Sequence, residues 1–286
     1  MWPAPGAGAD TAVESGAGAG TDAAAPPRAG ARAGSGRALR WLAPLATLIV
    51  IGGAWELYVD LHGVDSLVLP APHQIAAAIW NDRGTLASNF LYTAQEVVFG
   101  IIVGGLVAIA VSVLIHFSGA ARAALYPLLI ASQAVPIPVI APVLVFWLGF
   151  GLLPKLAVVA LVAFFPIAVT TLSALSRVDP DLLTLLRTLD ASRWQAFRIV
   201  EAPSALPALF TGTKLAAVFS VTGAVLAEQA GSSRGLGYLL TSTGPSLEIA
   251  LGFAAAVILA AFAITLFALL AVCERRVLPW AYHQGR

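Results

Sequence analysis

Long apolar runs alternate with short polar breaks along the chain, and this pattern predicts most of its structure. A helix needs about 20 apolar residues to cross a bilayer. Six runs approach this length: 40–58, 95–117, 121–149, 154–175, 205–228 and 247–273. We therefore expect an all-α fold, embedded in a membrane, with six spanning helices.

The beginning of the chain has a different pattern. Residues 1–36 are mostly Ala, Gly, Pro, Ser and Thr, so they cannot bury enough apolar surface to offset the entropy of ordering. We expect a disordered tail over 1–38, then a first span and an external loop over 39–87. A core transmembrane domain over 88–276 and a C-terminal tail over 277–286 complete the expected division.

The composition supports the membrane assignment. The chain is 59% hydrophobic and 11% charged, whereas soluble domains carry about 25% charged residues. Its net charge of +1 gives no reason to expect nucleic acid as a partner. The single cysteine, Cys273, excludes an intrachain disulfide and a cysteine metal cluster, and the four scattered histidines predict no metal site.

Lysine and arginine predict the orientation, because they favour the cytoplasmic side of a membrane. With the N-terminus in the cytoplasm, three basic residues fall outside: Arg83, Lys155 and Arg234. Thirteen fall inside: Arg28, Arg32, Arg37, Arg40, Arg122, Arg177, Arg187, Arg193, Arg198, Lys214, Arg275, Arg276 and Arg286. Both termini are therefore expected in the cytoplasm.

Small residues recur every four positions in the second apolar run, at Gly100, Gly104, Ala108 and Ser112. Such a stripe lets another helix backbone approach closely. We expect it to pack against a helix of the same subunit, and a subunit interface is the alternative.

The third run is interrupted by Pro127, Pro136, Pro138 and Pro142. Prolines free backbone carbonyls that lipid cannot satisfy, so this region should be buried in protein or face a watery cavity. Gln133 lies three residues before Pro136, and a polar side chain beside a broken helix is typical of a translocation path. An ordinary hydrogen bond between helices is the alternative.

An acidic residue, Glu228, ends the fifth run on the expected outer side. Because charge at a membrane edge is costly, Glu228 is a candidate for touching the substrate, holding a gate or meeting a binding protein. A solvated helix end is the alternative. The loop 231–237 follows, and its glycines permit positive-φ turns, which favours a gate or docking turn. Glu56 and Glu96, near other outer ends, are expected to be solvated.

The charged segment 179–203 separates the fourth and fifth runs. Arg187, Arg193 and Arg198 would each cost about 2.5–3.5 kcal/mol at the centre of a span. We therefore place this segment in the cytosol.

Local signals within this segment predict two short helices. Asp179-Pro180-Asp181 provides an N-cap, a proline in the first turn and an early acid. Ser192-Arg193-Trp194-Gln195 has the pattern of a capping box. A turn at Asp190-Ala191 should separate the helices, and the second helix should end near Ala202, before Pro203.

Three interpretations of these helices compete, and all of them use the apolar ridge of Trp194, Phe197 and Val200. The helices rest on lipid headgroups, read DNA as a helix-turn-helix, or enter a groove on a cytosolic partner. The near-neutral chain and the tether at both ends disfavour DNA. The turn that splits the segment disfavours the lipid surface.

The segment resembles the cytoplasmic loop of the permease subunits of bacterial ABC importers. Val200-Glu201-Ala202-Pro203 stands where that family has Ile-x-Leu-Pro, Asp190 stands at its usual Gly, and Thr184-Leu185-Leu186 at its Glu-Ala-Ala. Residues 187–212 and 227–240 are similar to the nitrate/sulfonate/taurine-type permeases, and within those to permeases for thiamine pyrimidine precursors.

The resemblance implies a mechanism. Two permease copies in the bacterial inner membrane line a path, cytosolic ATPase subunits bind ATP and Mg²⁺ and drive it, and an external binding protein delivers the solute. The implied coupling residues are Asp190, Ala191, Ser192, Arg193, Trp194, Phe197, Arg198, Glu201 and Pro203. The expected path residues are Gln133, Pro136, Pro138 and Glu228.

The chain itself is not expected to be an enzyme or to bind a cofactor. A phosphate-binding loop needs Gly-Lys followed by Ser or Thr, and the dipeptide Gly-Lys does not occur in the sequence. An ion-coupled secondary carrier is the alternative from another class, but no repeat and no acid well inside a span is evident. A membrane enzyme is disfavoured by the lack of a catalytic constellation.

The leading substrate class is a thiamine pyrimidine precursor, and the alternative is a sulfonate, taurine or nitrate-like anion. A path for anions should present basic residues near span interiors. The sequence shows one there, Lys214, towards the expected cytoplasmic end, which tilts the prediction away from anions, although helix N-termini also bind them.

Overall fold

The computed structural model describes residues 35–132 and 134–282, which contain helices and no strand. The chain divides into two compact units, Met1–Val50 and Ile51–Arg286. The first described helix, α1 (Ser35–His62), crosses this boundary. Everything that follows concerns the second unit.

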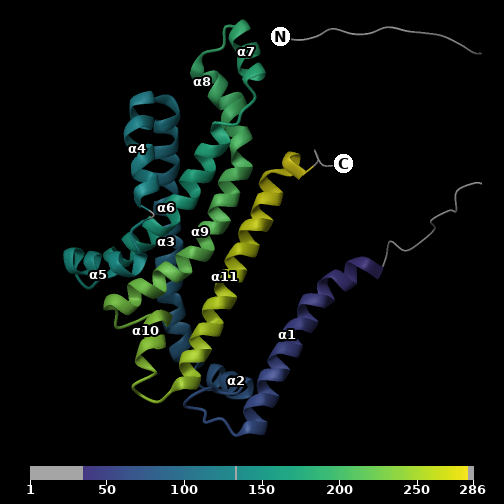
Figure 1. Cartoon of the computed structure of the whole chain (residues 1–286), viewed down its shortest axis with the longest axis vertical. Helices are drawn as coiled ribbons and strands as arrows, with labels where there is room; N and C mark the ends of the chain where they lie inside the picture. The colour runs from purple at the N-terminus through teal and green to yellow at the C-terminus, as the bar shows by residue number, and fades with distance from the viewer. Residues whose placement is uncertain (1–34, 133, 283–286) are drawn as a thin grey trace, which may run out of the picture. The chain divides into compact units, whose positions relative to one another are not determined.

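The remaining helices follow one another with short connections (Figure 1). Figure 1 shows α7 and α8 at one end of the second unit, called here the α7 end, and α10 at the opposite end, the α10 end. The elements are α2 (Pro72–Asn81), α3 (Arg83–Phe117), α4 (Gly119–Ser132), α5 (Ile137–Leu148), α6 (Leu152–Leu175), α7 (Pro180–Thr188), α8 (Arg193–Ala196), a π-helical turn (Phe197–Glu201), α9 (Ala202–Gly231), α10 (Leu236–Ser242), α11 (Ile249–Val277) and a 3-10 turn (Pro279–Tyr282).

Four helices of the described chain are long and apolar enough to cross a membrane: Arg83–Phe117, Leu152–Leu175, Arg193–Gly231 and Ile249–Val277. The pair α4 and α5 passes the same test together but is bent by 104°, so it is either a broken span or a re-entrant loop. The structure thus has up to five of the six expected spans. The first expected span falls within α1, and its crossing stays a prediction.

The bundle is built around α6, which packs most extensively against α3 and α9. The small-residue stripe of α3 makes this packing possible. A Cβ added at Gly100 would lie 2.3 Å from Val159 Cγ1, and one at Gly104 would lie 2.3 Å from the Ala160 carbonyl oxygen. Ser112 continues the stripe and donates a hydrogen bond to the Ala168 carbonyl at 3.3 Å. The stripe therefore packs within the subunit, as predicted.

The bend between α4 and α5 lies at the surface of the chain. Pro136 and Pro138 are exposed, and so are Phe146 and Trp147 further along α5. The expectation that this region is buried in protein is thus not met within one copy of the chain. Gln133, the polar side chain expected beside the break, lies outside the described residues.

The end predicted for the second cytosolic helix is wrong. Pro203 does not terminate a helix, because α8, the π-helical turn and α9 form one continuous helix from Arg193 to Gly231. Proline inside a helix removes one backbone hydrogen bond and crowds the carbonyl four residues before it, and a local π-helical turn accommodates both effects. The turn just before it is π-helical, with the Ala202 N–H bonded to the Phe197 carbonyl. The helix of the fifth expected span therefore continues directly into the charged segment 179–203.

Candidate functional site

The two helix starts in the segment 179–203 are capped as the local signals predict. The Asp179 carboxylate caps α7 by accepting a hydrogen bond from the Asp181 N–H at 2.9 Å. Ser192 and Gln195 form the capping box of α8: the Gln195 N–H donates to Ser192 Oγ at 3.3 Å, and the Ser192 N–H donates to Gln195 Oε1 at 2.7 Å. These bonds satisfy backbone donors that a helix start leaves free.

The turn between the two helices has a left-handed residue at Asp190, with φ of +54°. Glycine adopts this conformation without cost, and Asp is among the residues that tolerate it. The family motif has its glycine at this position, so Asp190 takes over the role of a turn residue. Ala191 completes the turn and is half-buried.

An apolar surface is exposed on this segment. Leu182 and Leu185 on α7 and Leu189, the residue that follows its last turn, recur at helical spacing and are all exposed. Trp194 on α8 is 58% exposed, and Ile199 in the π-helical turn is also exposed. Exposed large apolar residues that gather in this way mark an interaction surface.

The side chains of the expected ridge, Trp194, Phe197 and Val200, do not share one environment. Phe197 is half-buried and packs against Phe117 at the end of α3, with ring centroids 5.1 Å apart. Trp194 stacks on Phe197 at 5.4 Å but keeps its outer face free. Arg193 lies over the Phe117 ring at 5.8 Å. The aromatic cluster thus ties the segment to α3 and leaves Trp194 available to a partner.

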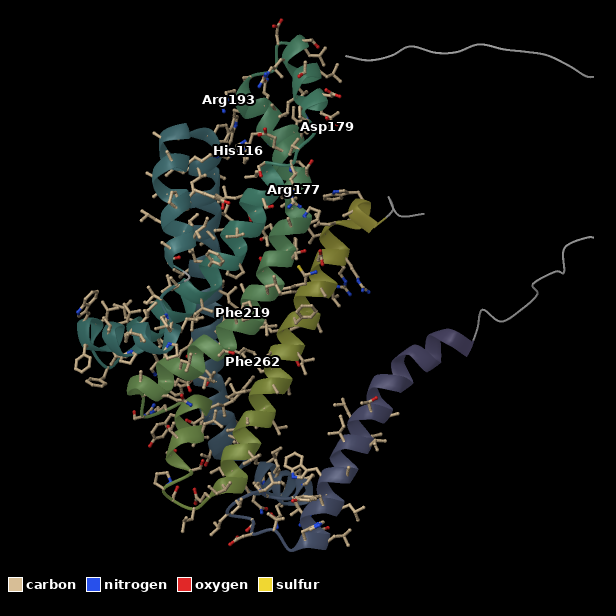
Figure 2. All side chains as sticks on the ribbon, in the orientation of Figure 1. His116, Arg177, Asp179, Arg193, Phe219 and Phe262 are labelled. Atoms are coloured by element: carbon tan, nitrogen blue, oxygen red, sulfur yellow. The ribbon has the colours of Figure 1, made fainter. Side chains whose placement is uncertain are left out.

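A hydrogen bond between side chains adds to this connection. Glu201 in the π-helical turn and His116 in the last turn of α3 approach to 2.8 Å, and both side chains are largely buried. His116 and Arg193, both labelled in Figure 2, line one small pocket at the α7 end. The sequence analysis identified Glu201 but missed His116, because 85 residues separate the partners. Arg198, by contrast, is exposed.

At the α10 end, Glu228 is 1% exposed, which contradicts the alternative of a solvated helix end. Its carboxylate accepts hydrogen bonds from Thr93 Oγ1 at 2.6 Å, from the Gly237 N–H at 2.5 Å and from the Tyr238 N–H at 3.3 Å. Glu228 therefore holds the loop 231–237 and the start of α10 in place. Its direct contact with a solute stays a prediction.

The backbone of the loop 231–237 passes close to the Glu228 carboxylate. Gly235 has φ of +111°, and a Cβ added there would lie 2.2 Å from the Glu228 carboxyl carbon. Its N–H donates to Asn89 Oδ1 at 2.7 Å, and the Leu236 N–H donates to Thr93 Oγ1 at 2.9 Å. Asn89 and Thr93 lie one turn apart on α3, so one face of α3 fixes the loop.

The expectation that Glu96 is solvated is wrong. Glu96 lies one further turn along that face of α3, is 0% exposed and forms an ion pair with Lys155 at 3.0 Å. Lys155, at the start of α6, is itself 8% exposed and donates to Ser232 Oγ at 2.7 Å. The sequence did not reveal the pair, because its members are 59 positions apart on different helices.

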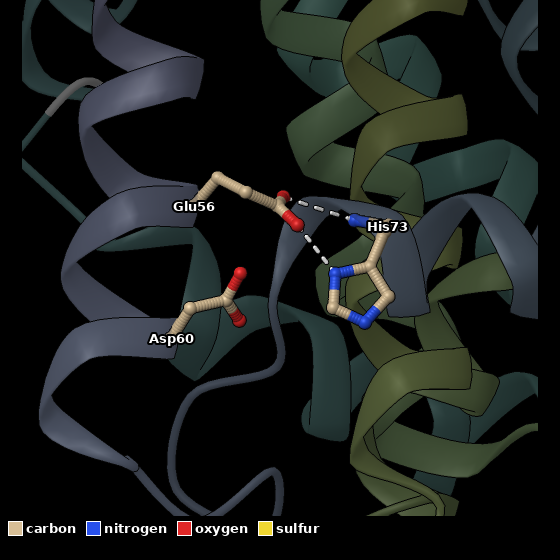
Figure 3. A group of neighbouring side chains, drawn as sticks. All are labelled: Glu56, Asp60 and His73. Carbon is tan, nitrogen blue, oxygen red and sulfur yellow. Dashed lines mark hydrogen bonds and ion pairs between the residues drawn. The ribbon is translucent and has the colours of Figure 1, made fainter.

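Another polar group joins the lower part of α1 to α2. Glu56 accepts a hydrogen bond from the His73 N–H at 3.2 Å and pairs with His73 Nδ1 (Figure 3). Asp60 lies beside them, which makes a set of three potential metal ligands within the described part of the chain. Because Glu56 satisfies a backbone N–H in the first turn of α2, helix capping accounts for the arrangement.

Sequence comparison identifies the family. Residues 97–279 match the model of the binding-protein-dependent transport system inner membrane component. The chain belongs to this ABC permease family. It is 31% identical to the formylaminopyrimidine transport permease protein ThiX of Halalkalibacterium halodurans, over 87% of this chain and 99% of that protein. It is 32% identical to the riboflavin transport system permease protein RibX of Chloroflexus aurantiacus, over 82% and 88%. It is 27% identical to the taurine transport system permease protein TauC of Escherichia coli, over 85% and 94%.

The permease fold is also found among solved structures. The MetNI methionine ABC transporter, in an inward-facing conformation, contains a chain that aligns with 66% of this one at a TM-score of 0.55 and 18% identity. The all-α membrane fold expected from the sequence is therefore confirmed. Permeases of this family are transport subunits without an ATPase site of their own.

Proposed function

We propose that this permease forms the translocation path of an ATP-driven importer for a small organic solute and that residues 190–203 couple it to a cytosolic ATPase. The main observation in support of this proposal is the exposed apolar surface at the α7 end, formed by Leu182, Leu185, Leu189, Trp194 and Ile199. It belongs to a segment that continues into a spanning helix without a break. A partner that moves this surface would therefore move α9.

Trp194 is the apolar anchor of this docking surface. Buried aromatic residues dominate the binding energy of small interfaces, and Trp194 is pre-positioned by its stacking on Phe197. Arg193 and Arg198 are exposed beside it and would pair with acidic groups of the ATPase. ATP and Mg²⁺ would be bound by that partner and not by this chain.

The rest of the assembly follows the same proposal. The α7 end and both termini lie in the cytoplasm, and an external binding protein docks at the α10 end. A second copy of the permease covers the exposed side of α5, where Phe146 and Trp147 are uncovered. The path then runs past Pro136, Pro138 and Gln133, and the loop held by Glu228 acts at its outer gate.

For the substrate, a thiamine pyrimidine precursor is supported by the similarity to the formylaminopyrimidine permease along almost its whole length. An aliphatic sulfonate or taurine is the alternative, supported by the similarity to the taurine permease. Both are small organic solutes, so the importer proposal does not depend on the choice between them.

The test is purification of the tagged chain from its own membranes in mild detergent, with bound proteins identified by mass. We expect an ATPase in near-equal amount, lost in Trp194→Glu and retained in the control Trp80→Glu, an exposed tryptophan on α2. If the chain is recovered without an ATPase under conditions that preserve membrane complexes, a secondary carrier becomes the better explanation and residues 190–203 become a lipid-surface element.

A further inference from the structure

A pocket of about 560 Å³ lies at the α10 end, where α3, the start of α6 and the loop after α9 meet. This volume is typical of small-molecule sites. Its apolar side includes Phe150, and its polar side is made by Tyr92, Lys155, Ser232, Ser233 and Arg234. We infer that this pocket binds the anionic head group of a small organic solute through Lys155 and Arg234, an inference that rests on the importer function proposed above.

The charges that a ligand meets in the pocket are positive. Glu96 also borders it, but its side chain is 0% exposed and lies behind the Lys155 ammonium. The ion pair cancels the charges of Glu96 and Lys155, whereas Arg234 on the rim pairs with no carboxylate within the described residues. The lining therefore has one more basic than acidic side chain, which favours an anion over a neutral solute. The Glu228 carboxylate lies behind this lining, where the Thr93 hydroxyl and the N–H groups of Gly237 and Tyr238 donate to it.

Lys155 is positioned to donate to a ligand. An ammonium group has three N–H donors. That of Lys155 donates to Ser232 Oγ at 2.7 Å and lies 3.0 Å from Glu96 Oε1, an ion-pair contact without hydrogen-bond geometry. The ammonium therefore keeps donor capacity that no described residue uses. Burying such an ion pair costs stability. Ligand binding explains why the pair is kept, because a donor that is fixed in advance and shielded from water interacts more strongly with a charged ligand.

The other donors are also held in place. The Arg234 guanidinium donates to the Tyr92 hydroxyl and lies over the Tyr92 ring at 5.2 Å. The Arg234 N–H and Ser232 Oγ are bonded to each other at 3.2 Å, so the rim of the loop is ordered. In addition, α6 begins on the pocket wall at Leu152 without a side-chain cap, and the positive end of its dipole adds to the attraction for an anion.

The charged groups of this pocket change which of the two substrate classes is favoured. The sequence favoured a neutral solute over an anion, because Lys214 was the basic residue found near the interior of a span. The structure brings Lys155 and Arg234 together on one pocket, which favours a sulfonate-like solute over a neutral pyrimidine.

The experiment uses the permease–ATPase complex in nanodiscs of phosphatidylcholine and isothermal titration with propanesulfonate and its neutral isostere propanesulfonamide. We expect the sulfonate to bind at least roughly tenfold more tightly, since charge-assisted hydrogen bonds are about twice as strong as neutral ones. Arg234→Gln should weaken sulfonate binding by roughly tenfold or more. The matched control is Arg83→Gln, which removes another arginine that lies over an aromatic ring at 5.2 Å and should leave binding unchanged.

A second variant removes the buried donor without leaving a buried charge. Glu96→Gln with Lys155→Met takes away both members of the ion pair and should abolish sulfonate binding while the complex still assembles. Equal binding of sulfonate and sulfonamide, or unchanged binding in Arg234→Gln, would overturn the inference.

Two further outcomes separate the possible failures. In the first, the complex assembles, hydrolyses ATP and binds an aminopyrimidine but no anion; the pocket inference is then wrong, whereas the proposed importer function is retained. In the second, no ATPase is recovered with the permease, and the proposed importer function itself is wrong. If sulfonate binding is lost in nanodiscs that contain phosphatidylglycerol, the pocket holds a lipid headgroup and the solute assignment is wrong.

Discussion

The two ends of the bundle differ in which side chains they expose and which they bury. At the α7 end, large apolar side chains are exposed and the helix starts are capped by neighbours in sequence, such as Ser192 with Gln195. At the α10 end, charged side chains are buried and paired across the fold, as Glu96 is with Lys155. The first arrangement needs a partner to cover it, whereas the second pairs its buried acidic groups within the chain.

This difference predicts where a substitution affects stability and where it affects assembly. Burying a charge without its partner costs several kcal/mol. Changing an exposed apolar residue leaves the fold nearly unaffected but alters what binds to it. Variants at the two ends should therefore separate in a melting experiment and in a co-purification experiment.

The largest effect on stability is expected from Lys155→Met. It leaves the Glu96 carboxylate buried without its ion-pair partner, which should cost about 3–5 kcal/mol. Thermal unfolding of the permease in detergent measures the loss. Adding Glu96→Gln should recover most of it, since neither charge then remains. A double variant that is as unstable as the sum of the two single variants would show that the pair has no coupling.

A smaller loss is expected from Gly235→Ala. The new Cβ would lie 2.2 Å from the Glu228 carboxyl carbon, in addition to the strain of a positive φ. We expect a cost of about 2–4 kcal/mol in the unfolding free energy. The control is Gly63→Ala, which also has a positive φ but no atom within 4 Å of the added Cβ, and should cost about 1 kcal/mol. Equal melting temperatures for the two variants would contradict the role of the Glu228 contact.

The opposite result is expected for Leu185→Ser at the α7 end. Leu185 is exposed on α7, so the melting temperature of the isolated permease should change by less than the equivalent of about 0.5 kcal/mol. ATPase binding should weaken by about 1–2 kcal/mol, because the residue belongs to the proposed docking surface. Titration of the purified ATPase measures this. A stable variant with unchanged affinity would remove Leu185 from the interface.

The same contrast explains what the sequence could predict. Caps, turns and helix periodicity depend on residues within a few positions of each other, so Asp179, Asp190 and Ser192 were placed correctly. The small-residue stripe of α3 was also recognised, because its spacing alone defines a close helix contact.

The buried network at the α10 end could not be found in this way. Thr93 and Glu228 are 135 residues apart, and nothing near Glu96 in the sequence distinguishes it from a solvated acid. Pro203 was misread for a related reason. A proline often ends a helix, but the π-helical turn just before Pro203 lets this helix continue past it.

The smallest effect is expected from Ser192→Ala. It removes the side chain that caps α8, a loss of about 1 kcal/mol. Because α8 continues into α9, the loss should be confined to the start of the helix and should appear as faster hydrogen exchange at the Gln195 amide, with little change in melting temperature. Ser204→Ala is the matched control, since the Ser204 hydroxyl donates to the Val200 carbonyl and caps no helix. Equally fast exchange at Gln195 in both variants would mean that the capping box does not hold the docking surface in shape. A selective change in Ser192→Ala, accompanied by weaker ATPase binding, would show that local order at the α7 end contributes to coupling.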